Sequence, residues 1–443
     1  MKDKIIAKLK DKKIAILGFG REGIATYTLI RKYLPNQDLV IIDSIDKSEA
    51  EQVKNDAHVN FIYGENYLSN LDIYDYVIKT PGISLKDIDT TKTNITSEIE
   101  LILEVAKDRV IGITGTKGKS TTSSLIYNIL KENGVDTVFA GNIGIPVFSM
   151  LDQVTDKTIF VIEMSSHQLE YLKISPHIGV VLNLFEDHLD HAGSVHHYHE
   201  IKMNMFKNQT KEDYMIYCSD NESLYNMINT YNFKGKAYSI NMKNKATTYV
   251  KDNMVYYQEN PAFSTDIKRN LLGTHNLENI LVAYTVSKIL NLDDETTLNT
   301  ISNFKSLEYR LECIGEVNQV KYYVDTLATI PSATKEAIEA IPNINTLIFG
   351  GMDRGISYEG FAEYLKSTSI EHFICMPTTG HKIGKELPSN RTYFVETLEE
   401  ACKLAKEITK PQTACILSPA AASYEHFKNY AEKGDKYKEY ILN

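Results

Sequence analysis

Cysteine is scarce in this sequence, and its arrangement suggests neither crosslinks nor a zinc ribbon. Five cysteines are scattered over 443 residues without a Cys-x-x-Cys pair, at Cys218, Cys313, Cys375, Cys402 and Cys415. An odd number of separated thiols is typical of a reducing compartment and argues against a disulfide framework. A chain of this length buries enough apolar surface to fold without one.

Long apolar runs and an excess of positive charge are missing as well. No stretch approaches the roughly 18 consecutive apolar residues of a membrane span, and the apolar residues after the basic N-terminus run directly into glycines. Lys and Arg total 48 against 58 Asp and Glu, a formal net charge of −10. This balance argues against a nucleic-acid or membrane-surface binder, although a local phosphate pocket stays possible. We expect a cytoplasmic monomer with neither kind of partner.

Short apolar runs that end in glycine or polar residues alternate with helical patterns along the chain. Such alternation predicts an α/β fold with mainly parallel sheets and ligands at the carboxyl ends of the strands. The predicted strands are 14–17, 40–43, 76–83, 110–113, 160–166, 178–185, 320–326, 345–351, 371–377 and 413–423.

Three domains follow from this pattern and from the chain length. We place a Rossmann-like N-terminal domain at 1–108, a central parallel-sheet domain of the P-loop ATPase type at 109–305, and a C-terminal Rossmann-like α/β domain at 306–443. The polar stretch 214–266 predicts loops and antiparallel strands, and 275–290 predicts an amphipathic helix.

A phosphate-binding loop is the strongest local signal. GTKGKST, residues 115–121, follows a predicted strand and opens a predicted helix. Glycines let backbone N–H groups approach phosphate oxygens, Lys119 reaches the outer phosphates, and a hydroxyl such as that of Ser120 can ligate Mg²⁺. The spacing departs from the standard Walker motif, because Ile113 stands where its first glycine would be. The alternative is a tight turn with an incidental lysine.

A second glycine-rich turn, GFGREG at 18–23, fits G-x-G-x-x-G and is followed by Asp43 at the end of the next strand. A dinucleotide site and a plain glycine turn are both compatible with it.

Polar residues at two further strand ends share the edge of the sheet with the phosphate loop. Glu163 ends one predicted strand and His188 follows another, so both are candidates for holding metal ions. Five histidines between 188 and 199 leave a zinc cluster as an alternative, although their spacing favours a solvated loop. Lys202, on a predicted helix at 198–208, indicates by itself no more than a solvated charge.

An ordered set of motifs resembles the Mur ligases, ATP-dependent amide-forming enzymes of peptidoglycan synthesis. The set spans the chain and is most similar to the members that add glutamate to UDP-N-acetylmuramoyl-L-alanine. It comprises GTKGKST (115–121), GNIGIP (141–146), EMSSHQLE (163–170), NLFEDHLD (183–190), YHEIK (198–202), GTHNLEN (273–279), YR (309–310) and SPAAAS (418–423).

The resemblance implies domains for the UDP-sugar, ATP and the amino acid, in that order, and it implies roles for single residues. Two Mg²⁺ ions and ATP are the implied cofactor and co-substrate, and Lys119, His188 and Lys202 are the implied catalytic residues, with Lys202 carbamylated. The implied metal ligands are Ser120, Glu163, His188 and Lys202. The implied ATP contacts are Gly115, Thr116, Lys117, Gly118, Lys119, Ser120, Thr121, Asn142, Asn276, Asn279, Arg310 and Asp325. The implied substrate contacts are Gly18, Phe19, Arg21, Asp43, Ser44, Thr80, Pro81, Gly82, Arg354, Ser423 and Tyr430.

The sequence departs from the family pattern near the implied amino-acid pocket. Where the family carries Asp-Ser-Lys-Ala-Thr-Asn, this chain has DTLATIPSAT at 325–334, with Leu327 at the lysine position and Pro331 beyond it. Arg354 stands where the family usually has lysine, and its forked guanidinium binds a carboxylate with a different geometry.

The expected activity is therefore ATP-dependent ligation of glutamate to UDP-N-acetylmuramoyl-L-alanine through an acyl phosphate. D-glutamate is the default and L-glutamate the alternative. Another Mur-like ligase and a P-loop regulator are the remaining alternatives.

Overall fold

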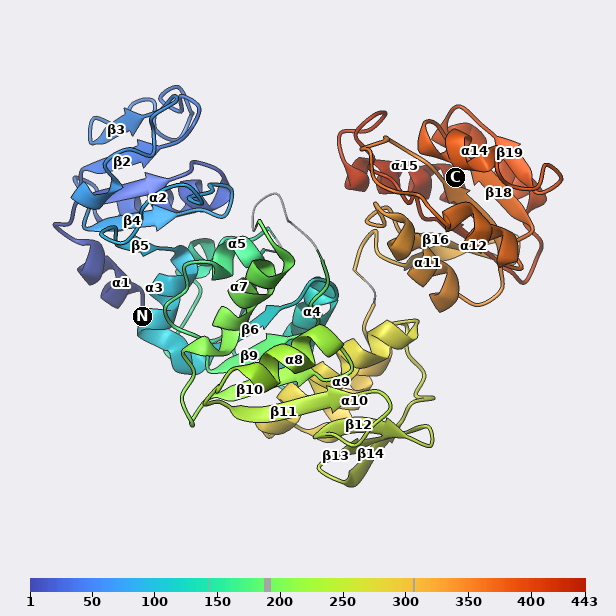
Figure 1. Cartoon of the computed structure of the whole chain (residues 1–443), viewed down its shortest axis with the longest axis horizontal. Coiled ribbons are helices and arrows are strands. Elements are labelled where there is room, and N and C mark those ends of the chain that lie inside the picture. Colours follow the sequence, from blue (N-terminus) through green and yellow to red (C-terminus); the bar gives the residue numbers. More distant parts are fainter. Residues whose placement is uncertain (143, 187–192, 306) are drawn as a thin grey trace. The chain divides into compact units, whose positions relative to one another are not determined.

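The computed structural model describes residues 1–142, 144–186, 193–305 and 307–443, which form three β-sheets (Figure 1). They pack as two compact units, Met1–Ile267 with Glu278–Ser302 and Lys268–Leu277 with Asn303–Asn443. The predicted α/β class is confirmed, whereas the boundaries near 108 and 305 stay predictions. Within the described ranges, no helix has the length and apolarity needed to cross a membrane.

The N-terminal sheet is fully parallel, with the strand order β3-β2-β1-β4-β5. The chain leaves β1 for β2 on one side and reaches β4 on the other, so the carboxyl end of β1 is a topological switch point, where ligands bind. The predicted strand 76–83 is too long, because Pro81 lacks the N–H that a ladder needs. The elements are α1 (Lys2–Leu9), β1 (Ile14–Leu17), α2 (Arg21–Tyr33), β2 (Leu39–Ile42), β3 (Val59–Ile62), η1 (Leu71–Ile73), β4 (Tyr76–Lys79), β5 (Ile95–Thr96), α3 (Glu98–Ala106) and η2 (Lys107–Arg109).

The central sheet has the order β14-β13-β12-β11-β10-β9-β6-β8-β7 and is parallel from β7 to β12. Its elements are β6 (Val110–Thr114), α4 (Lys119–Glu132), β7 (Thr137–Gly141), η3 (Val147–Met150), β8 (Ile159–Glu163), α5 (Ser166–Leu169), β9 (Ile178–Val181), α7 (Val195–Lys207), β10 (Tyr214–Cys218), α8 (Glu222–Thr230), β11 (Lys236–Asn241), β12 (Thr248–Lys251), β13 (Met254–Tyr257), β14 (Asn260–Ser264), α9 (Thr274–Ile289) and α10 (Asp294–Asn303).

The expectation of loops and antiparallel strands at 214–266 is partly wrong. The antiparallel part is confirmed for β12, β13 and β14. However, β10 and β11 extend the parallel sheet, and α8 lies between them. The start of β11 is exposed, so its polar residues hide the strand from a reading based on apolar runs.

The C-terminal sheet has the order β15-β16-β20-β17-β18-β19, and β15 is its one antiparallel strand within the described residues. The four predicted strands correspond to β16, β17, β18 and β20. The predicted strand 413–423 is too long, because β20 ends at Leu417 and a loop follows it. The elements are β15 (Glu312–Val317), β16 (Val320–Val324), α11 (Pro331–Ala340), β17 (Ile344–Phe349), α12 (Phe361–Ser367), β18 (His372–Cys375), α13 (Thr379–Gly384), β19 (Thr392–Phe394), α14 (Leu398–Ile408), β20 (Ala414–Leu417) and α15 (Tyr430–Leu442).

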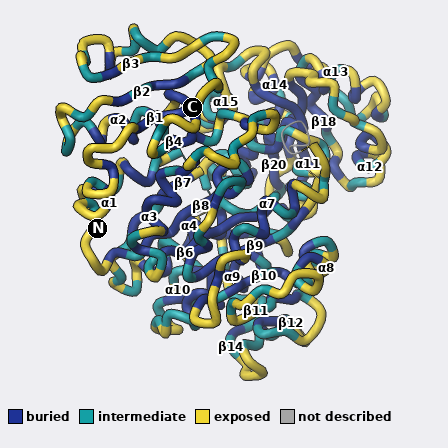
Figure 2. Tube along the Cα trace, turned by 60° about the vertical axis from the view of Figure 1, so that its left-hand side comes forward, coloured by how far each residue is buried: buried dark blue, intermediate teal, exposed yellow. Residues whose placement is uncertain are grey.

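Burial follows the strands, as Figure 2 shows by its dark blue segments. Every residue of β1, β6, β9, β17 and β20 is buried. Parallel strands that are covered on both faces are rich in apolar residues, and these strands could therefore be predicted from the sequence.

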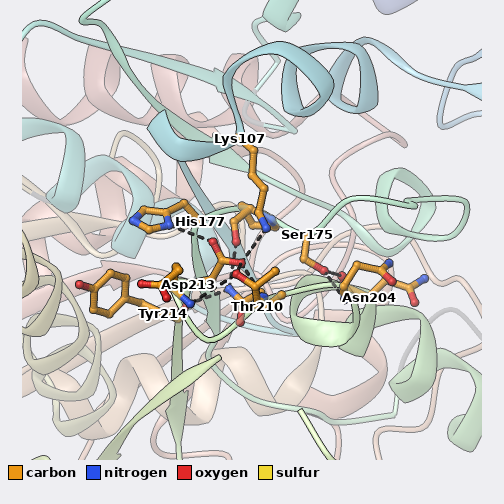
Figure 3. A network of polar contacts seen from close by, with 11 residues as sticks. Lys107, Ser175, His177, Asn204, Thr210, Asp213 and Tyr214 are labelled. Atoms are coloured by element: carbon orange, nitrogen blue, oxygen red, sulfur yellow. Dashed lines mark hydrogen bonds and ion pairs between the residues drawn. The ribbon is translucent and has the colours of Figure 1, made fainter. Parts of the chain in front are cut away.

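A buried polar network joins the amino ends of three central strands (Figure 3). The Asp213 carboxylate, just before β10, accepts hydrogen bonds from Lys107 Nζ at 2.6 Å and from the Thr210 backbone N–H at 2.6 Å, and it pairs with His177 Nδ1 at 2.9 Å. Lys107 precedes β6, and His177 immediately precedes β9. The network therefore ties the strand starts at the edge opposite the phosphate loop.

Candidate active site

The phosphate loop has the predicted context, between the end of β6 at Thr114 and the start of α4 at Lys119. Gly118 has φ +84°, and a Cβ there would lie 2.7 Å from Asn279 Oδ1, so the position requires glycine. The Thr116 N–H donates to Asn183 O at 3.0 Å and the Lys117 N–H to Asn183 Oδ1 at 2.8 Å. Asn183, which the sequence analysis did not single out, thus braces the loop.

Two lysines converge on this loop. Lys119 Nζ donates to the carbonyl of Gly115 at 2.9 Å and to that of Thr116 at 3.0 Å. Lys202 Nζ donates to the same Gly115 carbonyl at 3.0 Å, and Lys202 is 1% exposed. Reading Lys202 as a solvated charge is therefore wrong. Two ammonium groups beside the N-terminus of α4 create a strongly anion-attracting site.

Glu163, the last residue of the neighbouring strand β8, has one carboxylate oxygen that is buried without a hydrogen-bond partner among the described residues. It pairs in register with Ile113 of β6, and its Oε1 accepts a hydrogen bond from Asn142 Nδ2 at 2.7 Å. Its Oε2 is buried and has no hydrogen-bond partner among the described residues. Because an unpaired buried carboxylate oxygen is costly, Glu163 fits a hard cation such as Mg²⁺.

The described residues contain no cluster of three His, Cys, Asp or Glu side chains able to cage a metal. Mg²⁺ does not need one, because it keeps waters and binds substrate phosphates. His188 and His191 lie outside the described residues. His196 and His197 are exposed, and their Nδ1 atoms lie 3.5 and 3.6 Å from Glu200 Oε2.

Both predicted adenine-side asparagines are buried on α9. Asn279 Oδ1 accepts a hydrogen bond from Thr122 Oγ1 of α4 at 3.0 Å, which joins α9 to the phosphate-loop helix. Asn276 belongs to the second unit, where its Nδ2 donates to Leu272 O at 2.6 Å.

Asp325 and Arg310, also in the second unit, are held close to the end of β16. Asp325 accepts hydrogen bonds from Ser418 Oγ at 2.9 Å and from the Leu311 N–H at 3.2 Å. Burial nevertheless raises the pKa of Asp325 to about 7, against these bonds and the charge of Arg310. Arg310 Nε is buried with no hydrogen-bond partner in the described part of the chain, and such a donor suits an incoming anion.

The predicted amino-acid residues gather on two adjoining loops. Arg354 is exposed in the loop after β17, and Ser423 follows β20. The Met352 N–H donates to Ala422 O at 2.9 Å, which joins the two loops. Ser423 Oγ is buried and has no partner among the described residues. Tyr430, the first residue of α15, is 41% exposed.

The predicted UDP-sugar residues lie at the carboxyl ends of β1, β2 and β4. Gly18 has φ +92°, and a Cβ there would lie 2.1 Å from Thr80 Oγ1. The Phe19 N–H donates to Asp43 Oδ2 at 2.8 Å. These contacts fix the turn over the switch point of this sheet. Ser44 follows Asp43, and Pro81 and Gly82 follow Thr80.

Arg21 opens α2 and faces the central domain, since a Cβ on Gly144 would lie 2.8 Å from Arg21 Nη1. Next to Arg21, Glu22 Oε1 accepts a hydrogen bond from Gln168 Nε2 of α5 at 2.7 Å. The sequence did not reveal this contact between α2 and α5, because nothing local marks its two partners.

A nucleotide-binding α/β protein with a phosphate loop is the class that this fold and site define. Family comparison narrows the class: residues 113–287 match the Mur ligase middle domain, and residues 309–421 match the Mur ligase glutamate ligase domain. The chain belongs to the Mur ligase family.

Relatives of similar length support this membership. The chain is 32% identical to the UDP-N-acetylmuramoylalanine--D-glutamate ligase of Acetivibrio thermocellus and 34% identical to that of Clostridium acetobutylicum, over 98% of this chain and 97% of each relative. Among solved structures, MurF from Acinetobacter baumannii matches with a TM-score of 0.64 at 13% identity, covering 98% of both chains. MurC from Thermotoga maritima matches with a TM-score of 0.61 at 18% identity, covering 97% of this chain and 99% of that one. These two likenesses concern the fold alone.

Proposed function

We propose that this protein is an ATP-dependent ligase that joins D-glutamate to UDP-N-acetylmuramoyl-L-alanine, acting as a cytoplasmic monomer. The observation that carries the proposal is the convergence of Lys119 and Lys202 on the Gly115 carbonyl, in the same sheet as the open oxygen of Glu163. The curated relatives named for this reaction give the choice of substrates.

In the first step, the substrate carboxylate attacks the γ-phosphate of ATP and gives an acyl phosphate and ADP. Two anions must approach each other, and Lys119 with the backbone N–H groups of the loop offsets the repulsion. Asn279 and Thr122 keep α9 against the phosphate-loop helix. The motif resemblance also assigns Arg310 and Asp325 to ATP.

Ser120, Glu163 and Lys202, together with His188, would hold two Mg²⁺ ions, which supply charge neutralisation at the phosphates. Lys202 contributes to this as a carbamate, because addition of CO₂ to its amine replaces a cation with an anion. The shared carbonyl supports this role: unmodified, Lys119 and Lys202 both place an ammonium group on Gly115 O, and a carbamate on Lys202 replaces one of these two positive charges with a negative one.

In the second step, the amine of glutamate attacks the acyl phosphate, and phosphate leaves from the tetrahedral intermediate. Arg354 binds a glutamate carboxylate, and the Ser423 hydroxyl supplies a further hydrogen bond. Tyr430 packs against the amino acid.

Phosphate release with ATP, Mg²⁺ and UDP-N-acetylmuramoyl-L-alanine tests the proposal, with D-glutamate in one reaction and L-glutamate in a parallel one. Release that depends on D-glutamate is the expected result. Release with L-glutamate alone would assign the changed residues 325–334 and Arg354 to the opposite stereochemistry. Release with neither amino acid, or release without the UDP-sugar, would overturn the proposal and favour another Mur-like ligase or a P-loop regulator.

A further inference from the structure

Lys433 is a buried lysine that the proposed mechanism does not use. It lies one turn into α15 and is 1% exposed. Its Nζ donates to the backbone carbonyl of Gly350 at 2.9 Å and lies 5.9 Å from the ring centroid of Phe427. Burial lowers the pKa of Lys433 to about 7. Because an ammonium group is strongly hydrated in water, its burial against a neutral carbonyl calls for a reason.

The carbonyl that Lys433 holds belongs to the first residue of the loop that leads to Arg354. The Gly350 N–H donates to Pro419 O at 2.9 Å, and the Met352 N–H donates to Ala422 O at 2.9 Å. The next carbonyl of the loop, that of Gly351, accepts hydrogen bonds at 3.0 Å from the backbone N–H groups of Thr378 and Thr379, which follow β18. Lys433 adds the contact from α15.

The glycines let the backbone of this loop pack closely on its neighbours. Gly350 has φ +124°, and a Cβ there would lie 2.3 Å from Met376 O. A Cβ on Gly351 would lie 2.4 Å from Ala422 O. The backbone is therefore packed directly on its neighbours, and the polar group that reaches it from α15 is a side chain. Removing that side chain leaves the Gly350 carbonyl without this donor.

We propose that Lys433 is a positioning residue for the proposed amino-acid site: by holding the Gly350 carbonyl, it sets the path of the loop that carries Arg354, which is joined to the loop that carries Ser423 by the Met352–Ala422 hydrogen bond. This inference rests on the proposed function, which assigns glutamate to Arg354 and Ser423. Lys433 lies on the same helix as Tyr430, which the proposed function also assigns to glutamate.

Lys433→Met tests the inference in the full-length protein by steady-state kinetics. We expect the KM for glutamate to rise at least about tenfold, since a misplaced binding group loses orientation. The KM values for ATP and the UDP-sugar should stay within about twofold, and kcat within about threefold. Lys433→Arg keeps N–H donors for the carbonyl and should keep the KM for glutamate within about threefold of wild type. The matched control is Lys436→Met, which removes an exposed lysine of α15 that pairs with Glu439.

Amide hydrogen exchange supplies a readout that does not depend on the reaction. In Lys433→Met, the Gly351 and Met352 amides should exchange at least about tenfold faster, while those of β17 keep their rates. Unchanged exchange, or three KM values that rise together, would overturn the inference. A wild-type protein without glutamate-dependent phosphate release would instead overturn the proposed function, and the exchange result would still decide whether Lys433 fixes the loop. If Lys433→Met does not fold, Lys433→Gln, with its shorter side chain, takes its place with the same expectations.

Discussion

The Asp213 network predicts a large loss of stability from a change far from the catalytic edge. The side chain of Asp213 is 5% exposed, whereas those of Lys107 and His177 are 26% and 27% exposed. Removing one partner of a fully buried ion pair costs about 3–5 kcal/mol. Because the side chains of Lys107 and His177 keep some access to water, we expect Asp213→Ala to cost about 3 kcal/mol, at the lower end of that range. Asp213→Asn keeps one acceptor for the Thr210 N–H and should cost about 2 kcal/mol.

The pH dependence of this effect has a definite sign. Burial alone would raise the pKa of Asp213, but the hydrogen bonds from Lys107, Thr210 and His177 outweigh it, and the pKa is lowered from 3.8. The folded chain therefore releases the proton more readily than the unfolded chain. The stabilisation is complete above pH 3.8 and is lost as the pH falls through the lowered pKa.

Urea unfolding followed by circular dichroism measures the cost, and steady-state kinetics on the same samples measures the KM for ATP. The network lies at the amino ends of β6, β9 and β10, and the phosphate loop lies at the carboxyl end of β6, so the KM should stay within about twofold. A cost below about 1 kcal/mol for Asp213→Ala would refute the reasoning from burial, because it would place the network among solvent-screened pairs.

Three further predictions concern the site and its surroundings. Lys202→Ala should abolish phosphate release, and small carboxylates added at millimolar concentration should restore part of it; a full rate without rescue would refute the carbamate role. Burial raises the pKa of Glu100 from 4.5 to about 6. The contribution of Glu100 to the free energy of unfolding should therefore fall as the pH rises over this range. In urea unfolding, the stability of Glu100→Gln relative to wild type should increase over the same range, whereas that of the exposed control Glu132→Gln should not. Arg354→Lys should change the ratio of kcat/KM for D- over L-glutamate at least about tenfold, because a point charge replaces a fork; an unchanged ratio would exclude Arg354 from stereochemical selection.

Local patterns were enough to predict most strands that position the site. A strand, a glycine turn and a helix are consecutive in sequence, so 110–121 could be interpreted without knowing what packs on it. The parallel strands β1 and β20 have continuous apolar runs because both faces are covered. β11 was not predicted, because its first two residues, Lys236 and Ala237, are exposed and the strand therefore lacks a continuous apolar run.

Burial and partner choice could not be predicted in this way. Lys202 has the sequence surroundings of a surface lysine, and only the packing of α7 against β6 and β9 places its Nζ on the Gly115 carbonyl. Lys433 is also charged and helical, and its burial depends on contacts with a loop some 80 residues earlier in the chain. The resemblance to the family motifs identified Lys202, because Lys202 lies within the YHEIK motif. It did not identify Lys433, which lies outside all the motifs.

The sequence departures near the proposed amino-acid site lie in regular elements and in the loops that follow them. Pro331 opens α11 at a position where proline is favourable, so the fold absorbs it at no cost. Leu327 is half-buried after β16 and puts an apolar side chain where the family has lysine. A Cβ on Gly350 would lie 2.3 Å from Met376 O, so the loop that carries Arg354 requires glycine at this position. Ser423 Oγ is buried and has no partner in the described ranges. If it binds glutamate as proposed, a ligand of the wrong hand would leave this hydroxyl unsatisfied.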